Sequence, residues 1–148
     1  MNKFDIDYIK NFIEAHPTAK IYIGSDSQRI KKKRVKFAVV VVVHYNGCNG
    51  AKVFADISYE DVSDAKLSRP FNRMMAEVQK LTELYEKLEA VIWDKDFEVH
   101  LDVNPDKNAG SNVAFAAARG MILGLIGVEP VVKPDAWCAS SCADKWSK

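Results

Sequence analysis

The sequence is poor in the features that mark several common protein classes. It has only three cysteines, an odd number without the paired Cys-x-x-Cys spacing of a zinc ribbon. Cys138 and Cys142 lie one helical turn apart, and we interpret them as small buried helix residues. This use of cysteine leads us to expect a reducing, cytoplasmic setting.

Long hydrophobic runs are also missing. No segment approaches about 18 consecutive apolar residues, and the start of the chain, MNKFDIDYIK, has no uninterrupted apolar stretch. We therefore expect neither a membrane span nor a signal peptide.

With 21 Lys plus Arg against 20 Asp plus Glu, the formal net charge is only +1. Such a balance gives no bulk attraction to nucleic acid or membranes, so any contact with a polyanion must be local.

No internal repeat, low-complexity tract or Pro/Gly/Ser-rich linker divides the 148 residues. A chain of this length buries about 68 to 70% of its unfolded surface, which is enough for a core without disulfides or structural metal. We expect one domain over residues 1–148, beginning with a helix.

Hydrophobic periodicity predicts three strands, followed by helices and strands in alternation. The predicted strands are 20–26, 35–45, 51–59, 97–103 and 129–132, and the predicted helices are 5–15, 69–92, one capped by Ser111 and Asn112, and one after Pro134. The first three strands suit an antiparallel meander. The last two, each reached across a helix, suit parallel pairing beside the first. This order predicts an α/β fold with a five-stranded mixed sheet and helices on both faces.

Four acidic residues stand where a carboxylate is out of place. Asp26 ends the apolar run IYIGSD, and Asp102 interrupts the apolar run VHLDV. Glu77 lies within the apolar stripe of the long predicted helix, and Asp144 belongs to the short terminal helix. A buried carboxylate carries a desolvation cost of several kcal/mol unless a cation compensates it. Four that converge suggest a divalent metal site, although Asp26 and Asp102 also suit strand-end aspartates that bond a turn.

The position of Glu77 follows from helix geometry. At about 100° per residue, the apolar residues of this helix fall within roughly 60° of Leu81, and Glu77 falls at about 40°. The apolar residues are Met74, Val78, Leu84, Tyr85, Leu88 and Ile92. Glu77 is therefore expected inside the buried stripe, whereas the helix's other glutamates suit a solvated face.

Four sequence motifs carry a family resemblance over nearly the whole chain: IGSDSQ, AEVQKL, HLDVNP followed by SN, and KPDAWCASSCADKWSK. They are similar to those of the YkuK-type proteins, a bacterial and phage branch of the ribonuclease H-like superfamily. The predicted topology is also that of the ribonuclease H-like fold. In the superfamily, carboxylates from the first strand, the first long helix, the fourth strand and the last helix hold two divalent ions.

The resemblance implies that Asp26, Glu77, Asp102 and Asp144 are catalytic metal ligands for two Mg²⁺ or Mn²⁺ ions. Asp135 is an alternative fourth carboxylate, but it suits a helix cap better. The implied function is a metal-dependent nuclease acting on RNA, DNA or a hybrid. The alternative is a non-catalytic nucleic-acid or protein binding module that keeps the fold.

The loop after the fourth predicted strand, and the strand itself, suggest two further interpretations. The alternation of Asp102, Asn104, Asp106 and Asn108 resembles an EF-hand, but Lys107 stands where the turn needs glycine, and the bidentate Glu is missing. His100 shares a strand face with Asp102. It suits a structural histidine better than a partner of the metal ligands.

The only dense basic cluster follows the first strand and comprises Lys31, Lys32, Lys33, Arg34 and Lys36. As a hairpin turn it would simply be solvated. Alternatively, it is a nucleic-acid-binding patch that contacts phosphates without reading sequence.

Overall fold

The structure is a computed structural model that describes residues 4–31, 33–45, 50–63, 66–103 and 112–147, except for the side chains at 112, 113 and 144. The strands are β1 (Lys20–Ile30), β2 (Arg34–His44), β3 (Ala51–Asp61) and β4 (Phe97–Leu101). The helices are α1 (Ile6–Glu14), α2 (Pro70–Ile92), α3 (Asn112–Leu125), the π-helical segment η3 (Cys138–Ala143) and α4 (Asp144–Ser147).

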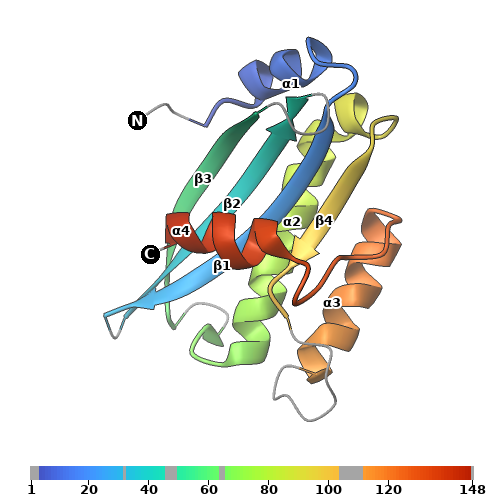
Figure 1. Ribbon diagram of the computed structural model, residues 1–148. Coiled ribbons are helices and arrows are strands. Elements are labelled where there is room, and N and C mark those ends of the chain that lie inside the picture. Colours follow the sequence, from blue (N-terminus) through green and yellow to red (C-terminus); the bar gives the residue numbers. More distant parts are fainter. Residues whose placement is uncertain (1–3, 32, 46–49, 64–65, 104–111, 148) are drawn as a thin grey trace.

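β1 is an inner strand of a four-stranded mixed sheet with the order β3-β2-β1-β4 (Figure 1). It pairs antiparallel with β2 and parallel with β4, as the sequence predicts. β1 runs four residues beyond its predicted end at Asp26, because its polar second half pairs with the start of β2, from Ser27 opposite Phe37 to Ile30 opposite Arg34. The extension makes β1 and β2 a long hairpin.

The predicted fifth strand is wrong among the described residues. Segment 129–132 contributes only an isolated parallel bridge between Val131 and His100. Val131 donates to the carbonyl of Val99 at 2.8 Å and accepts from Leu101 at 2.9 Å. Pro130 stands immediately before this bridge and has no N–H to donate, so regular pairing is interrupted there.

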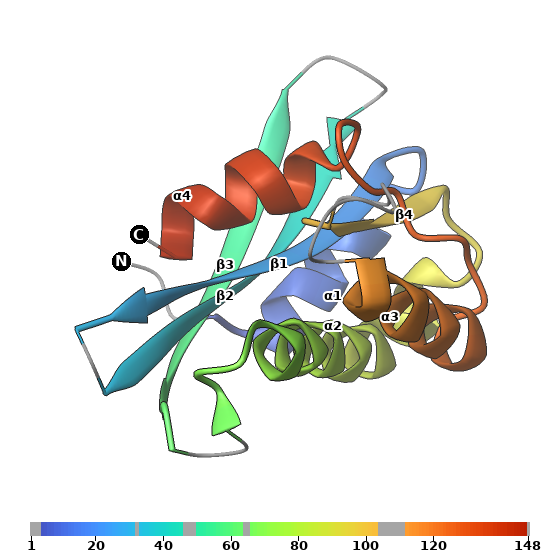
Figure 2. The same cartoon turned by 90° about the horizontal axis from the view of Figure 1, so that it is seen from below.

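The sheet is covered on both faces, as predicted (Figure 2). The helices α1, α2 and α3 lie on one face, and η3 and α4 cross the other. The main core lies between the sheet and the three long helices and includes Ile9, Ile23, Val41, Leu81, Leu88 and Ile122. A smaller cluster lies under η3 and α4 and includes Val40, Val42, Cys138 and Ala143.

The C-terminal segment approaches β1 closely at Gly24. A Cβ atom at this position would lie 2.9 Å from both the Ala139 nitrogen and the Cys138 carbonyl carbon. Only glycine allows the backbone of η3 to pack at this distance from the strand. This approach brings the C-terminal helix beside the middle of β1, where Asp26 lies.

Candidate functional site

The site lies where β1 and β4 separate. The last parallel pair joins Ser25 to Leu101, and the next residues along the two chains are Asp26 and Asp102. β4 ends at Leu101, so Asp102 follows the strand and does not lie within it, contrary to the prediction of a strand through Val103. The end of the ladder leaves two aspartates on adjacent backbones at the edge of the paired region.

Glu77 is placed next to this split by two serines of β1. Ser27 Oγ donates a hydrogen bond to Glu77 Oε2 at 2.7 Å, and Ser25 Oγ donates to the Glu77 backbone carbonyl at 3.2 Å. Glu77 is only 6% exposed, as its position in the apolar stripe predicts. Since Ser25 and Ser27 face α2, the intervening Asp26 points toward the opposite face of the sheet.

The surroundings of Glu77 disfavour the charged form of its carboxyl group. Burial, more than any other cause, raises its pKa to about 8, and the nearby carboxylates of Asp26 and Asp102 raise it further. The Ser27 hydrogen bond and the charge of Arg73 act in the opposite direction. The folded protein therefore favours the neutral form of Glu77, and Asp26 and Asp102 both lie within electrostatic reach of Glu77.

Asp102 has an incompletely satisfied carboxylate. Its Oδ1 atom is buried and has no hydrogen-bond partner among the described residues. Lys133 Nζ lies 3.1 Å from this oxygen as an ion pair. The contact does not have hydrogen-bonding geometry, and the lysine side chain is half exposed, so solvent weakens the attraction.

Asp26 and the helix that contains Asp144 are joined through a serine. Ser147 Oγ donates to Asp26 Oδ2 at 3.1 Å, and both residues are buried. Asp144 begins α4, the helix in which Ser147 lies. The helix that Asp144 begins therefore lies beside β1, and the Asp144 side chain is not among those that the structure describes. Asp135, the alternative, is exposed in the segment before η3.

The carboxyls fit a cation chemically, but they are not arranged as a ligand shell. Among the side chains that the structure describes, no three from His, Cys, Asp or Glu are placed to share one metal ion. Asp26 and Glu77 approach from opposite faces of β1, and each bonds a serine. However, the unsatisfied oxygen of Asp102 and the raised pKa of Glu77 are both features that a divalent cation would relieve.

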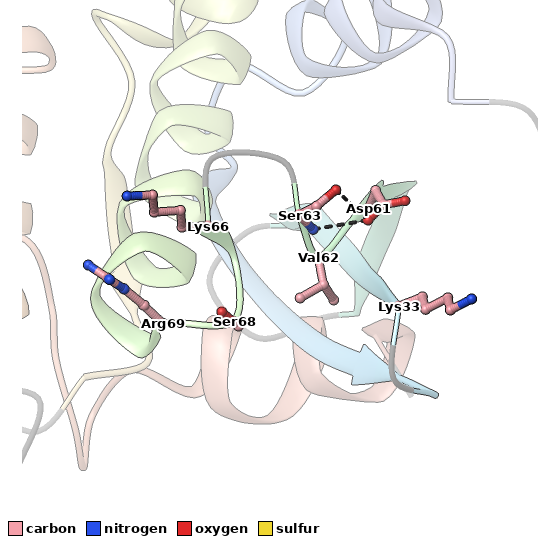
Figure 3. A pocket seen from close by; sticks show the side chains of 7 residues that line it. All are labelled: Lys33, Asp61, Val62, Ser63, Lys66, Ser68 and Arg69. Carbon is pink, nitrogen blue, oxygen red and sulfur yellow. Dashed lines mark hydrogen bonds between the residues drawn. The ribbon is translucent and has the colours of Figure 1, made fainter.

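The basic cluster lies at the β1–β2 turn, and Lys32 falls outside the described residues. Lys31 has a positive φ of 52° in the turn, and the Arg34 guanidinium lies 4.6 Å from the Tyr59 ring centre. Lys33 lines a hollow of about 430 Å³ that Lys66 and Arg69 also line. In Figure 3 the Lys33 side chain points away from the other two cations, so the hollow does not gather them around one point. None of the predicted carboxylates lines it.

His100 has a structural role in this arrangement. The Cys138 N–H donates to its Nδ1 at 3.1 Å, so the neutral ring carries its proton on Nε2, which donates to Glu98 at 2.9 Å. Burial lowers the pKa of His100 despite the opposing effect of Glu98. The ring therefore connects β4 to η3, as the interpretation of a structural histidine predicts. The rejected EF-hand positions Asn104, Asp106 and Asn108 lie outside the described residues.

Several residues of the site were missed in the sequence. The alternation of Ser25 and Ser27 in IGSDSQ was a usable signal, because side chains two residues apart on a strand share a face. Arg73 could also have been identified from the sequence, since it lies four residues before Glu77 on the same helix. Ser147 and Lys133 had no local signal, because only the folded chain brings them to Asp26 and Asp102.

The chain belongs to the ribonuclease H-like family. The family model described as Ribonuclease H-like matches residues 6–148, which confirms the resemblance seen in the sequence motifs. No curated protein and no solved structure matches the chain. None of the described helices is long and apolar enough to cross a membrane.

Proposed function

We propose that this protein is a divalent-metal-dependent nuclease that hydrolyses phosphodiester bonds of RNA, DNA or an RNA–DNA hybrid. The observation that carries the proposal is the placement of three carboxyls at the split between β1 and β4. Asp26 and Asp102 follow the last parallel pair, and Ser27, next to Asp26, bonds the buried Glu77. Membership of the ribonuclease H-like family supports it, but a fold alone does not establish an activity.

In this proposal Asp26, Glu77, Asp102 and Asp144 hold two Mg²⁺ or Mn²⁺ ions. Bound cations of this kind activate a water molecule as the nucleophile and stabilise the leaving oxygen of a phosphodiester. Hard cations require oxygen ligands from several directions, and the four carboxyls come from four segments of the chain: β1, α2, the residue after β4, and α4. Because a metal ligand must be deprotonated, Glu77 would have to give up its proton to bind a cation.

The substrate backbone would be held by local positive charge, since the chain as a whole has a formal net charge of only +1. The hairpin cations Lys31, Lys32, Lys33 and Arg34 are the proposed phosphate contacts. Contacts of this kind position a nucleic acid without reading its sequence. The proposed partner is therefore nucleic acid, either RNA, DNA or a hybrid of the two.

A cleavage assay tests the proposal. End-labelled RNA, DNA and hybrid duplexes are incubated with the protein in Mg²⁺, Mn²⁺ or EDTA, and the products are separated by length. We expect metal-dependent cleavage that Asp26→Asn and Asp102→Asn each abolish. Asp56→Asn is the matched control, because Asp56 is an exposed carboxylate on the edge strand β3. Absence of cleavage in every substrate and metal would refute the proposal.

A further inference from the structure

Two serines of β1 contact the same glutamate in different ways. Ser25 bonds the backbone carbonyl of Glu77, whereas Ser27 bonds its carboxyl oxygen Oε2. All three residues are buried, with exposed fractions of 2%, 4% and 6% for Ser25, Ser27 and Glu77. One strand face thus contacts both the backbone and the functional group of a single helix residue.

The two hydrogen bonds constrain different parts of Glu77. The Ser25 bond ties one turn of α2 to β1 and leaves the glutamate side chain free to rotate. The Ser27 bond, at 2.7 Å, restricts the side-chain torsions and fixes the direction of the carboxyl group. A long side chain held in one rotamer loses less freedom when it takes a ligand, because that entropy has already been lost on folding.

We infer that Ser27 is a positioning residue that orients the Glu77 carboxyl for cation binding, while Ser25 only anchors the helix. The inference rests on the proposed function, since it assigns Glu77 a cation to bind. Neighbours that hold a ligand's carboxylate typically affect metal affinity by about 10- to 100-fold. Ser27 has the contact required for such a role: a buried hydroxyl that donates directly to a carboxyl oxygen of Glu77.

Mn²⁺ affinity provides a readout that does not depend on catalysis. The free Mn²⁺ ion is titrated by its electron paramagnetic resonance signal in the presence of wild type, Ser27→Ala, Ser25→Ala and Glu77→Gln. Ser25→Ala is a matched control, because it removes the same hydroxyl from the same strand face and breaks a bond to the same residue. Thermal melts in EDTA establish that each variant is folded at the temperature of the titration.

We expect Ser27→Ala to raise the Mn²⁺ dissociation constant by about tenfold or more, and Ser25→Ala to leave it unchanged. Equal affinities for Ser27→Ala and wild type, or equal losses in both serine variants, would overturn the inference. A wild type that binds no Mn²⁺ would instead overturn the proposed function. If Ser27→Ala does not fold, Ser27→Val takes its place, since valine is well accommodated in a strand and also lacks a donor, and the same outcomes apply.

Discussion

Ser147 Oγ donates a hydrogen bond to Asp26 Oδ2 at 3.1 Å, joining two buried residues that are 121 positions apart in the chain. The bond holds α4 to the middle of the sheet, next to the smaller hydrophobic cluster against which Trp146 packs. It therefore connects the first predicted carboxylate to the helix that begins with Asp144. The C-terminal helix therefore contacts the candidate site directly through Asp26.

Loss of this contact is expected to destabilise the protein. Ser147→Ala leaves a buried carboxylate oxygen without this donor, at a cost of about 1 to 3 kcal/mol in the free energy of unfolding. Urea unfolding followed by tryptophan fluorescence measures the change. Ser140→Ala is the control, because Ser140 bonds the nearby carbonyl of Ala136 in the same segment and is only partly buried. Equal losses in the two variants would contradict a special role for the Asp26 contact.

Neutralising one aspartate of the site is expected to stabilise the metal-free protein. Asp26→Asn or Asp102→Asn removes a charge that repels ionised Glu77, so the melting temperature in EDTA should rise at pH values above about 8, where Glu77 is ionised. The same change should remove the additional stability that millimolar Mn²⁺ gives the wild type. Thermal melts with and without Mn²⁺ measure both effects. If wild type gains nothing from Mn²⁺ and both variants are simply less stable, the carboxylates are structural.

The raised pKa of Glu77 predicts a pH-dependent stability. Its folded pKa of about 8 lies above the ordinary value of 4.5, so the folded state favours the neutral form. The corresponding stabilisation is present below the ordinary pKa and is lost as pH rises through about 8. The slope reaches at most about 1.4 kcal/mol per pH unit for one proton.

Glu77→Gln should remove this pH dependence. Unfolding free energies of wild type and variant, measured in urea from pH 4 to pH 9, are subtracted at each pH. The subtraction isolates Glu77, because His100 titrates in both proteins. The unfolding free energy of the variant minus that of wild type should increase as pH rises. A difference independent of pH would contradict the raised pKa of Glu77.

Gly24→Ala tests the close approach of η3. The added Cβ would meet backbone atoms of Cys138 and Ala139 at 2.9 Å, so the strand or η3 must shift, at about 1 to 3 kcal/mol. Gly120→Ala is a control with the opposite expected sign. Gly120 lies inside α3 and a Cβ there meets nothing within 4 Å, so alanine should stabilise by about 0.5 to 1 kcal/mol. Chemical unfolding of both variants measures the contrast.

The hairpin cations predict a specific salt response. Replacing Lys31, Lys32 and Lys33 together by Ala should weaken binding equally for all sequences and flatten the dependence of affinity on salt. Each lost contact with duplex DNA should reduce the slope of log K against log salt by about 0.9. Fluorescence anisotropy over a salt series measures it, with Lys87→Ala on α2 as the control. An unchanged slope would assign the cluster to solvent.

Several features of the fold were predictable because they depend on local pattern. The run of valines in β2 and the period of α2 gave these elements within a residue of their observed ends, and the helical period placed Glu77 in the core. Asp5 caps α1 by accepting from the N–H groups of Asp7 and Tyr8. The fifth strand was wrong, because apolar β-branched residues at 131 and 132 indicate a strand, but pairing beside β4 also requires regular backbone donors.

The amino-acid sequence by itself determined the family, the order of the helices and of the first four strands, and the place of Glu77 in the buried stripe of α2. These follow from motifs and from the periods of 3.6 and 2, which operate over a few residues. Tertiary structure alone decided that Ser147 bonds Asp26, that Lys133 lies beside Asp102 and that β4 ends before Asp102. Such contacts join segments far apart in the chain, and they are set by how the layers pack and where the ladder ends. The raised pKa of Glu77 belongs to this second group, because burial and neighbouring charge exist only in the folded protein.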